Sequence, residues 1–227
     1  MFKKPTDWPS TRPSCQSIFA QFGQDRMMLI NWALNTGDPL ADALVSEMHD
    51  IGMKKGHEQF RLAAKEGLRA VSDPTPALIS FFTEVEEIAN QTDDYLLEEA
   101  CLPFFTIPRY IHTISLSAGG LLRVYSSPSI AYVLTATGRL NIGAERRLVE
   151  TSKWLYTATL PGSLRRGNAG YVDTLYVRLL HAHMRNVARE KGFDESKEGV
   201  AINQIDLART WIDFTFTSYT VFGYVRL

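Results

Sequence analysis

Apolar and polar positions repeat with a helical period along most of this chain. Between positions 18 and 34 the apolar residues recur every three or four positions, a spacing that gathers them on one face of a helix. The same period continues through 39–52, 53–71 and 76–90, and it returns at 144–159, 170–190 and 205–216. Strand signals are weak, and the one β-branched and aromatic cluster, at 215–227, fits a strand or a helix. The pattern predicts an all-α fold of about eight to ten helices.

Turn and cap residues set the boundaries of these helices. The triplet GDP at 37–39 and the stretch SDPTP at 72–76 predict new helices with a proline in the first turn. Thr92 or Asp93 is expected to open the next helix. In 39–52, the expected inward side consists of Leu40, Ala43, Leu44 and Met48.

The proline-rich start predicts an extended lead-in over 1–17, which is followed by one helical domain over 18–227. Because the sequence stops at Leu227 without a polar tail, we expect that domain to be truncated at its C-terminus.

The longest apolar segment, 102–125, does not resemble a membrane span. Arg109, His112 and two prolines interrupt it, and charged groups and helix breakers are unfavourable in a lipid-spanning helix. We expect a buried helix pair or the wall of a pocket, and no transmembrane segment. The first residues also lack an apolar run of signal-peptide length, so a cytoplasmic location is expected.

Composition narrows the possible partners. Hydrophobic residues make up 45% of the chain, charged residues 22%, and the formal charge is −1. This balance gives no broad basic surface, so a nucleic-acid partner is disfavoured. The two cysteines, Cys15 and Cys101, lack the spacing of a zinc site, and the common hydrolase, kinase and dinucleotide-binding motifs are absent. The oligomeric state stays open.

Two consecutive helices carry the residues of chemical interest. On the first, Arg147 and Thr151 are four positions apart and share a face. On the second, His181 lies among apolar positions, with Arg178 and Arg185 about one turn to either side. A neutral imidazole is a suitable axial ligand for haem iron, and nearby guanidinium groups can pair with haem propionates.

Each of these residues also has an ordinary structural interpretation. A single histidine on an apolar helix face is more often a packing residue than a ligand, and an arginine like Arg147 often covers apolar atoms with its stem. His181 and His183 point in different directions on a helix and cannot share one ion. We interpret His49 and His57 as surface histidines.

Several sequence blocks resemble one family. They are DPLADALVSE (38–47), TATGRL (135–140), ERRLVETSKW (145–154), GNAGYVDTLYVRLLHAHMRNVARE (167–190) and INQIDLARTWIDFTF (202–216). Their order is similar to that in the rubber oxygenases (latex-clearing proteins) and the related membrane-bound oxygenase of mycophenolic acid biosynthesis. The resemblance extends from about 38 to about 222. It implies an all-α fold that encloses haem b, with iron held by His181 and with Arg147 and Thr151 on the distal, O2-binding side.

The chain departs from the rubber-cleaving members at two points. They have a lysine directly before the distal threonine, where this chain has Glu150. They also have an upstream distal glutamate, whereas SSPSIAYVLTATG (126–138) contains no acid. The resemblance therefore implies a haem b-dependent oxygenase that uses O2 on a small apolar substrate, such as an alkene of isoprenoid type, rather than on polyisoprene itself.

Two other functions stay open at this point. One is a haem-binding sensor or carrier without oxygenase activity. The other is a non-catalytic helical interaction protein in which His181 is simply a packing residue.

Overall fold

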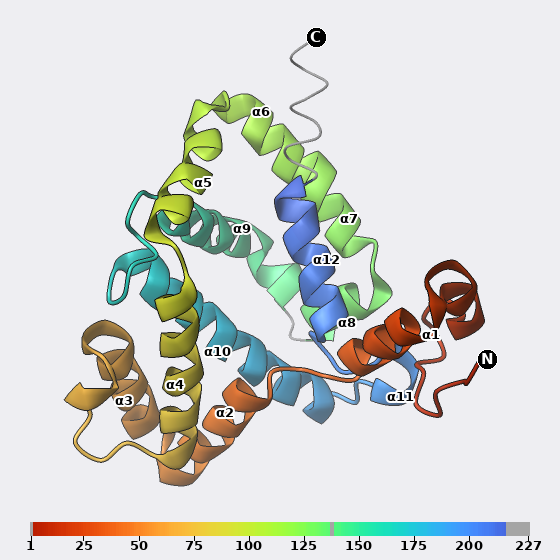
Figure 1. The fold of residues 1–227 in the computed structure, drawn as a ribbon, viewed down its shortest axis with the longest axis horizontal. Coiled ribbons are helices and arrows are strands. Elements are labelled where there is room, and N and C mark those ends of the chain that lie inside the picture. Colours follow the sequence, from red (N-terminus) through yellow and green to blue (C-terminus); the bar gives the residue numbers. More distant parts are fainter. Residues whose placement is uncertain (1, 137–138, 217–227) are drawn as a thin grey trace. The chain divides into compact units, whose positions relative to one another are not determined.

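Helices form the whole regular structure of the described chain. The computed structural model describes residues 2–136 and 139–216 (Figure 1). Its elements are α1 (Cys15–Leu34), α2 (Pro39–Ile51), α3 (Met53–Glu66), the 3₁₀-helix η1 (Leu68–Ala70), α4 (Pro76–Gln91), α5 (Asp94–Thr106), α6 (Arg109–Ile114), the π-helix η2 (Ser115–Leu121), α7 (Leu122–Tyr125), α8 (Pro128–Ala136), α9 (Arg139–Ala158), α10 (Ala169–Glu190), α11 (Glu195–Glu198) and α12 (Gln204–Phe214). Within the described residues there is no strand, which confirms the all-α prediction. The ambiguous segment 217–227 lies outside them.

Helix starts follow the cap residues of the sequence. The Thr75 side chain accepts a hydrogen bond from the Leu78 amide before α4, and Asp93 accepts one from the Tyr95 amide before α5. Such side-chain acceptors satisfy amides that have no partner within the first turn. The first helix begins three residues earlier than predicted, because Ser14 caps it, and it is kinked at Gly23, whose φ is 82°.

The chain contacts group into two compact units. Unit 1 consists of the described residues of 1–38, 109–142 and 184–227, and unit 2 consists of 39–108 and 143–183. The division passes through α9 after Ile142 and through α10 after His183. The predicted division into a lead-in over 1–17 and one domain over 18–227 stays a prediction.

Unit 2 is built around aromatic residues of α3 and α4. Phe60, Phe81 and Phe82 are at most 1% exposed, and the Phe60 ring centroid lies 5.5 Å from that of Phe82 and 5.8 Å from that of Phe81. Helix α10 contributes Leu175 and Leu179 to the same core. Burial of these rings removes a large apolar area from water, which is the main driving force for folding of this unit.

One expectation for α2 was wrong. Ala43 is exposed, while Ala41 and Val45 join Leu44 and Met48 in the core. The inward face of α2 is therefore rotated from the predicted one, because α2 packs against both α3 and α4 and its buried arc is wider than one stripe.

Unit 1 contains a buried charged network that holds the N-terminal segment. The Arg12 guanidinium donates to both carboxylate oxygens of Asp206, at 3.0 and 2.7 Å, and to the Ser129 hydroxyl at 2.9 Å. The Asn203 side-chain amide also donates to Asp206, at 2.9 Å. Asp206 is 4% exposed, so these donors replace the water that its charge would otherwise bind. The first residues are thus anchored to α8 and α12.

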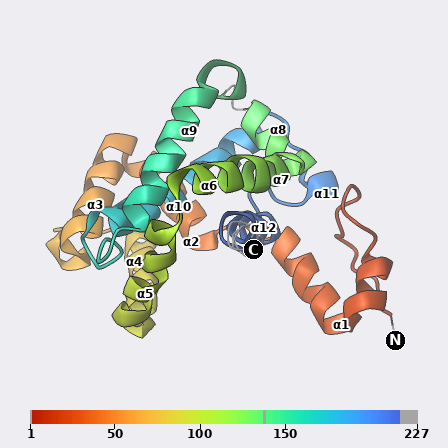
Figure 2. The same ribbon diagram turned by 90° about the horizontal axis from the view of Figure 1, so that it is seen from above.

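The apolar segment 102–125 differs from the expected buried pair or pocket wall. From residue 109 it forms one continuous rod of α6, η2 and α7, which lies beside α12 in unit 1 (Figure 2). On this rod His112 and Ser115 are buried while Tyr110, Ile114 and Leu122 are exposed. Among the described residues, no helix has the length and hydropathy needed to span a membrane.

Candidate functional site

A hydrogen bond joins α9 and α10 close to the loop between them. The Trp154 indole N–H donates to the Thr174 hydroxyl at 3.2 Å. Nearby, a Cβ at Gly170 would lie 2.7 Å from the Ser163 Oγ and 2.9 Å from the Ala158 Cα. Glycine at this position therefore allows the start of α10 to pack directly on the end of α9. The two helices are fixed to each other at this end of unit 2.

The predicted haem residues lie one to two turns from this hydrogen bond, on the side away from the loop. Thr151 lies about one turn before Trp154, and Arg147 about two turns before it. His181 lies about two turns after Thr174. Because residues three, four and seven positions apart share a helix face, Thr151 belongs to the face of α9 that carries Trp154, and His181 to the face of α10 that carries Thr174.

Thr151 and His181 are both half-buried. They are thus shielded in part by the protein while keeping some exposed surface. The side chain of Arg147 lies outside the described residues, so its predicted role stays a prediction.

Arg178 already has partners within unit 2. Its guanidinium lies 2.6 Å from a carboxylate oxygen of Glu84 on α4, and its central carbon lies 4.6 Å from the centroid of the Phe81 ring. The ion pair and the cation–π contact both hold the guanidinium against α4. To bind a haem propionate, Arg178 would have to release the Glu84 carboxylate.

Arg185 belongs to unit 1 and is completely buried, with an exposed fraction of 0%. Its Nη1 donates to the backbone carbonyl of Ile202 at 3.3 Å. This arginine lies one turn after His181, as predicted, but its guanidinium contributes to the interior of unit 1. Its assignment to a propionate stays a prediction.

Three histidines that the sequence analysis kept apart lie together in unit 2. The His183 ring centroid is 5.8 Å from that of His57 and 6.1 Å from that of His49. Burial lowers the pKa of His183, and the neighbouring His57 and His49 lower it further. Its buried Nε2 has no hydrogen-bond partner among the described residues. The sequence feature that indicates this proximity is Gly52, which separates α2 from α3 and lets the two helices fold back on each other.

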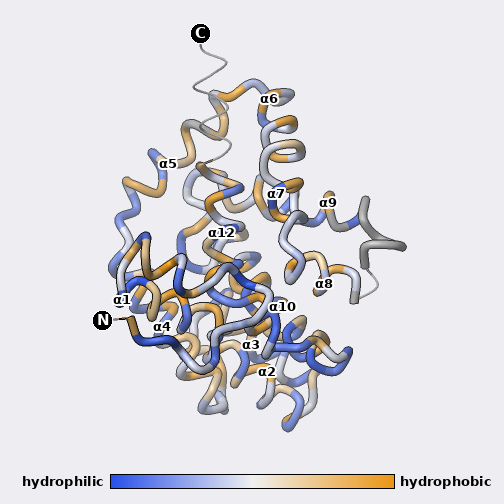
Figure 3. Tube along the Cα trace, turned by 90° about the vertical axis from the view of Figure 1, so that its right-hand side faces the viewer, coloured by the Kyte–Doolittle hydropathy of each residue, from blue (hydrophilic) through white to orange (hydrophobic). Residues whose placement is uncertain are grey.

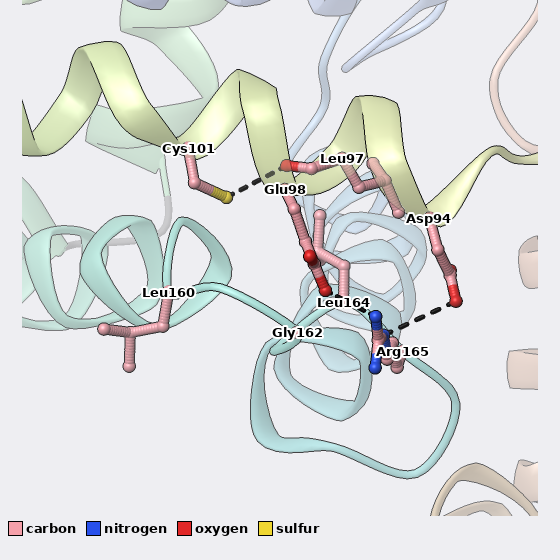
Figure 4. A pocket seen from close by; sticks show the side chains of 8 residues that line it. All are labelled: Asp94, Leu97, Glu98, Cys101, Leu160, Gly162, Leu164 and Arg165. Atoms are coloured by element: carbon pink, nitrogen blue, oxygen red, sulfur yellow. Dashed lines mark hydrogen bonds and ion pairs between the residues drawn. The ribbon is translucent and has the colours of Figure 1, made fainter.

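A small cavity lies elsewhere in unit 2, between α5 and the loop that follows α9 (Figure 4). Its volume is about 10 Å³ and its lining includes Cys101 and Arg165. Arg165 pairs with Glu98 and lies 3.4 Å from a carboxylate oxygen of Asp94. A space of this size holds at most about one water molecule, and neither Thr151 nor His181 lines it. The cavity is therefore part of the packing at a loop.

The donor set offers haem one ligand, and its two arginines already contact other protein groups. His181 offers an imidazole, the usual axial ligand of haem iron, whereas Arg178 and Arg185 are engaged with protein groups. Among the described residues, no group of three or more histidine, cysteine, aspartate or glutamate side chains is arranged to hold a metal ion. A single protein ligand is enough for haem, because the macrocycle supplies the other four donors.

Comparison with known proteins gave no relative. No family model, no curated protein and no solved structure matched the chain.

Proposed function

We propose that this chain is a haem b-dependent oxygenase that uses O2 on a small apolar substrate containing an alkene. The observation that carries the proposal is the Trp154–Thr174 hydrogen bond, because Thr151 shares a face of α9 with Trp154 and His181 shares a face of α10 with Thr174. The resemblance of the sequence blocks and their order to the rubber oxygenases favours the same function. A cytoplasmic location and O2 as co-substrate are parts of the same proposal.

His181 would hold the iron. Its place within a long helix restricts the ring orientation, and its half-burial limits competition from water. Bound haem would supply the binding and activation of O2, chemistry that amino-acid side chains do not provide. To pair with the propionates, Arg178 would have to release Glu84, and Arg185 would have to leave the interior of unit 1.

Thr151 would supply a hydroxyl on the O2-binding side of the site. A threonine hydroxyl can donate one hydrogen bond and accept others, so Thr151 could orient O2, the substrate or a water molecule. Its half-buried position makes such a hydrogen bond stronger than one made in bulk water. The methyl group of the same side chain adds an apolar contact for the substrate.

Replacement of Thr151 by valine tests this role. Because valine has a nearly identical shape but no hydroxyl, we expect haem binding to persist while O2-dependent turnover falls by about 10- to 100-fold. The measurement is O2 consumption together with mass spectrometry of the products, using squalene as the alkene. Thr157→Val provides the control, since the Thr157 hydroxyl is already bonded to the Lys153 carbonyl at 2.8 Å.

A haem carrier or sensor is the second candidate function. The absence of any acidic residue in 126–138 favours it, because an oxygenase of this type would need another group as its base. A haem-loaded parent protein that binds O2 but leaves squalene unchanged would contradict the oxygenase proposal and support the carrier.

A further inference from the structure

The rod formed by α6, η2 and α7 exposes its apolar side. Tyr110 is 68% exposed, Ile114 57% and Leu122 65%. Along the same side lie Ala118 and Tyr125, which are also exposed. We call these five residues the apolar stripe; the hydropathy-coloured trace shows apolar positions recurring along the rod (Figure 3). A contiguous row of exposed apolar side chains is often an interaction surface.

The opposite side of the rod is occupied by α12. Arg123 bonds the buried carboxylate of Asp213 at 2.8 Å. A Cβ at Gly120 would lie 3.1 Å from the Asp213 carbonyl oxygen, so the two helices approach closely at that glycine. This side therefore faces α12 within unit 1, and the rod cannot turn its stripe inward without losing these contacts.

The π-helix keeps the stripe in line. In an α-helix, residues four positions apart drift by about 40° around the axis. The wider turn of a π-helix reverses this drift, because it holds more than four residues. Since η2 covers Ser115–Leu121, Ile114, Ala118 and Leu122 stay on one side of the rod.

The stripe is nearly symmetric in side-chain size about Ala118. A branched aliphatic residue lies four positions away on each side, and a tyrosine lies close to each end. The smallest residue is thus at the centre, where two crossing helices approach each other most closely. A two-fold interface needs this kind of self-complementarity, since the same surface serves both partners.

Polar groups along the stripe add little cost to its burial. The Ser117 hydroxyl donates to the Thr113 carbonyl at 2.7 Å, and so it already has an acceptor. Between positions 110 and 125 the sequence contains one charged residue, Arg123, and its guanidinium is paired with Asp213. Two copies could therefore meet along the stripe without placing like charges against each other.

We propose that the apolar stripe binds a second copy of this chain, with the two rods antiparallel and crossing at Ala118. Ile114 then packs against the second copy's Leu122, and Tyr110 lies near the second copy's Tyr125. The exposed surface of the large side chains amounts to roughly 400 Å² per copy, which is about half of the area that a standard interface buries on each partner. The dimer is accordingly weak.

Sedimentation of the full chain at about 100 μM tests the proposal. The parent and Leu29→Arg should form dimers, whereas Ala118→Arg should be monomeric because it places two positive charges at the two-fold axis. Leu29 is a matched control, being 60% exposed on α1 of the same unit. A parent that stays monomeric, whether or not it sediments with phosphatidylcholine vesicles, overturns the proposal. So does a dimer that Ala118→Arg leaves intact.

Oxidative cross-linking tests the register. Ala118→Cys places two thiols at the two-fold axis and should give a disulfide-linked dimer on mild oxidation. Ile114→Cys should cross-link less, since its expected neighbour is the second copy's Leu122. The parent controls for the buried thiols of Cys15 and Cys101. Stronger cross-linking by Ile114→Cys than by Ala118→Cys would overturn the antiparallel arrangement.

Discussion

Replacement of Arg12 by alanine is expected to lower the free energy of unfolding of unit 1 by about 3 to 5 kcal/mol. Arg12 donates two hydrogen bonds to Asp206 and a third to Ser129. Without the guanidinium, the carboxylate of Asp206, which is 4% exposed, keeps its charge in a site that water barely reaches. Its remaining donors, the Ser129 hydroxyl and the Asn203 amide, offset only part of the lost solvation.

Urea denaturation followed by hydrogen exchange in α8 and α12 measures this loss. Arg26→Ala, at an exposed position of α1, should change stability by less than about 0.5 kcal/mol. A double variant, Arg12→Ala with Asp206→Asn, should lose less stability than the sum of the losses in the two single variants, because it removes the uncompensated charge. An Arg12→Ala protein as stable as Arg26→Ala would contradict a structural role for this network.

Replacement of Phe60 by alanine is expected to lower the free energy of unfolding of unit 2 by about 3 to 5 kcal/mol. Phe60 is 0% exposed, and its ring centroid is 5.0 Å from that of Tyr176 on α10. It also contacts Phe81 and Phe82, so its removal opens a cavity at the point where α3, α4 and α10 meet. The surrounding helices cannot close this space without losing their own contacts.

Thermal and urea unfolding of three variants test this core. Phe60→Leu should lose clearly less free energy of unfolding than Phe60→Ala, because leucine refills most of the space. Phe105→Ala removes the same atoms from a side chain that is 50% exposed, and its cost should be much smaller. Equal losses for Phe60→Ala and Phe105→Ala would mean that the aromatic cluster is not the centre of unit 2.

Cap residues and periodicity located most helix boundaries before the structure was known. Thr75 followed by Pro76 placed the start of α4, and Asp93 the start of α5. These signals are local, because a cap and the amide that it accepts are only a few residues apart. The predicted end of α9 and both predicted ends of α10 agree with the structure to within one residue, because Pro161 and Gly167 break the helix between them, whereas α9 begins at Arg139, five residues before the predicted start.

The inward side of an element was harder to predict than its ends. The rod of 109–125 buries His112 and Ser115 and exposes Ile114 and Leu122. Hydrophobicity alone assigns the apolar side to the core, but the contact with α12 needs the small Gly120 and the Arg123 pair on the other side. Such a preference depends on residues about ninety positions away, which no local pattern contains.

Partners of the candidate site were likewise hidden in the sequence. Arg178 contacts Glu84, and His183 contacts His49 and His57. Each pair joins α10 to a helix far from it along the chain, so spacing gives no sign of it. What the sequence did predict was the chemistry of each side chain and its place on its own helix face.

The absorption spectrum of the protein expressed with a haem precursor tests the central claim most directly. The parent should show a Soret band, which His181→Ala should lose or shift, while His183→Ala, two positions along the same helix and also half-buried, should keep it. Circular dichroism establishes that each variant is folded. A folded parent without the band, or a band that His181→Ala leaves unchanged, would contradict haem binding through His181.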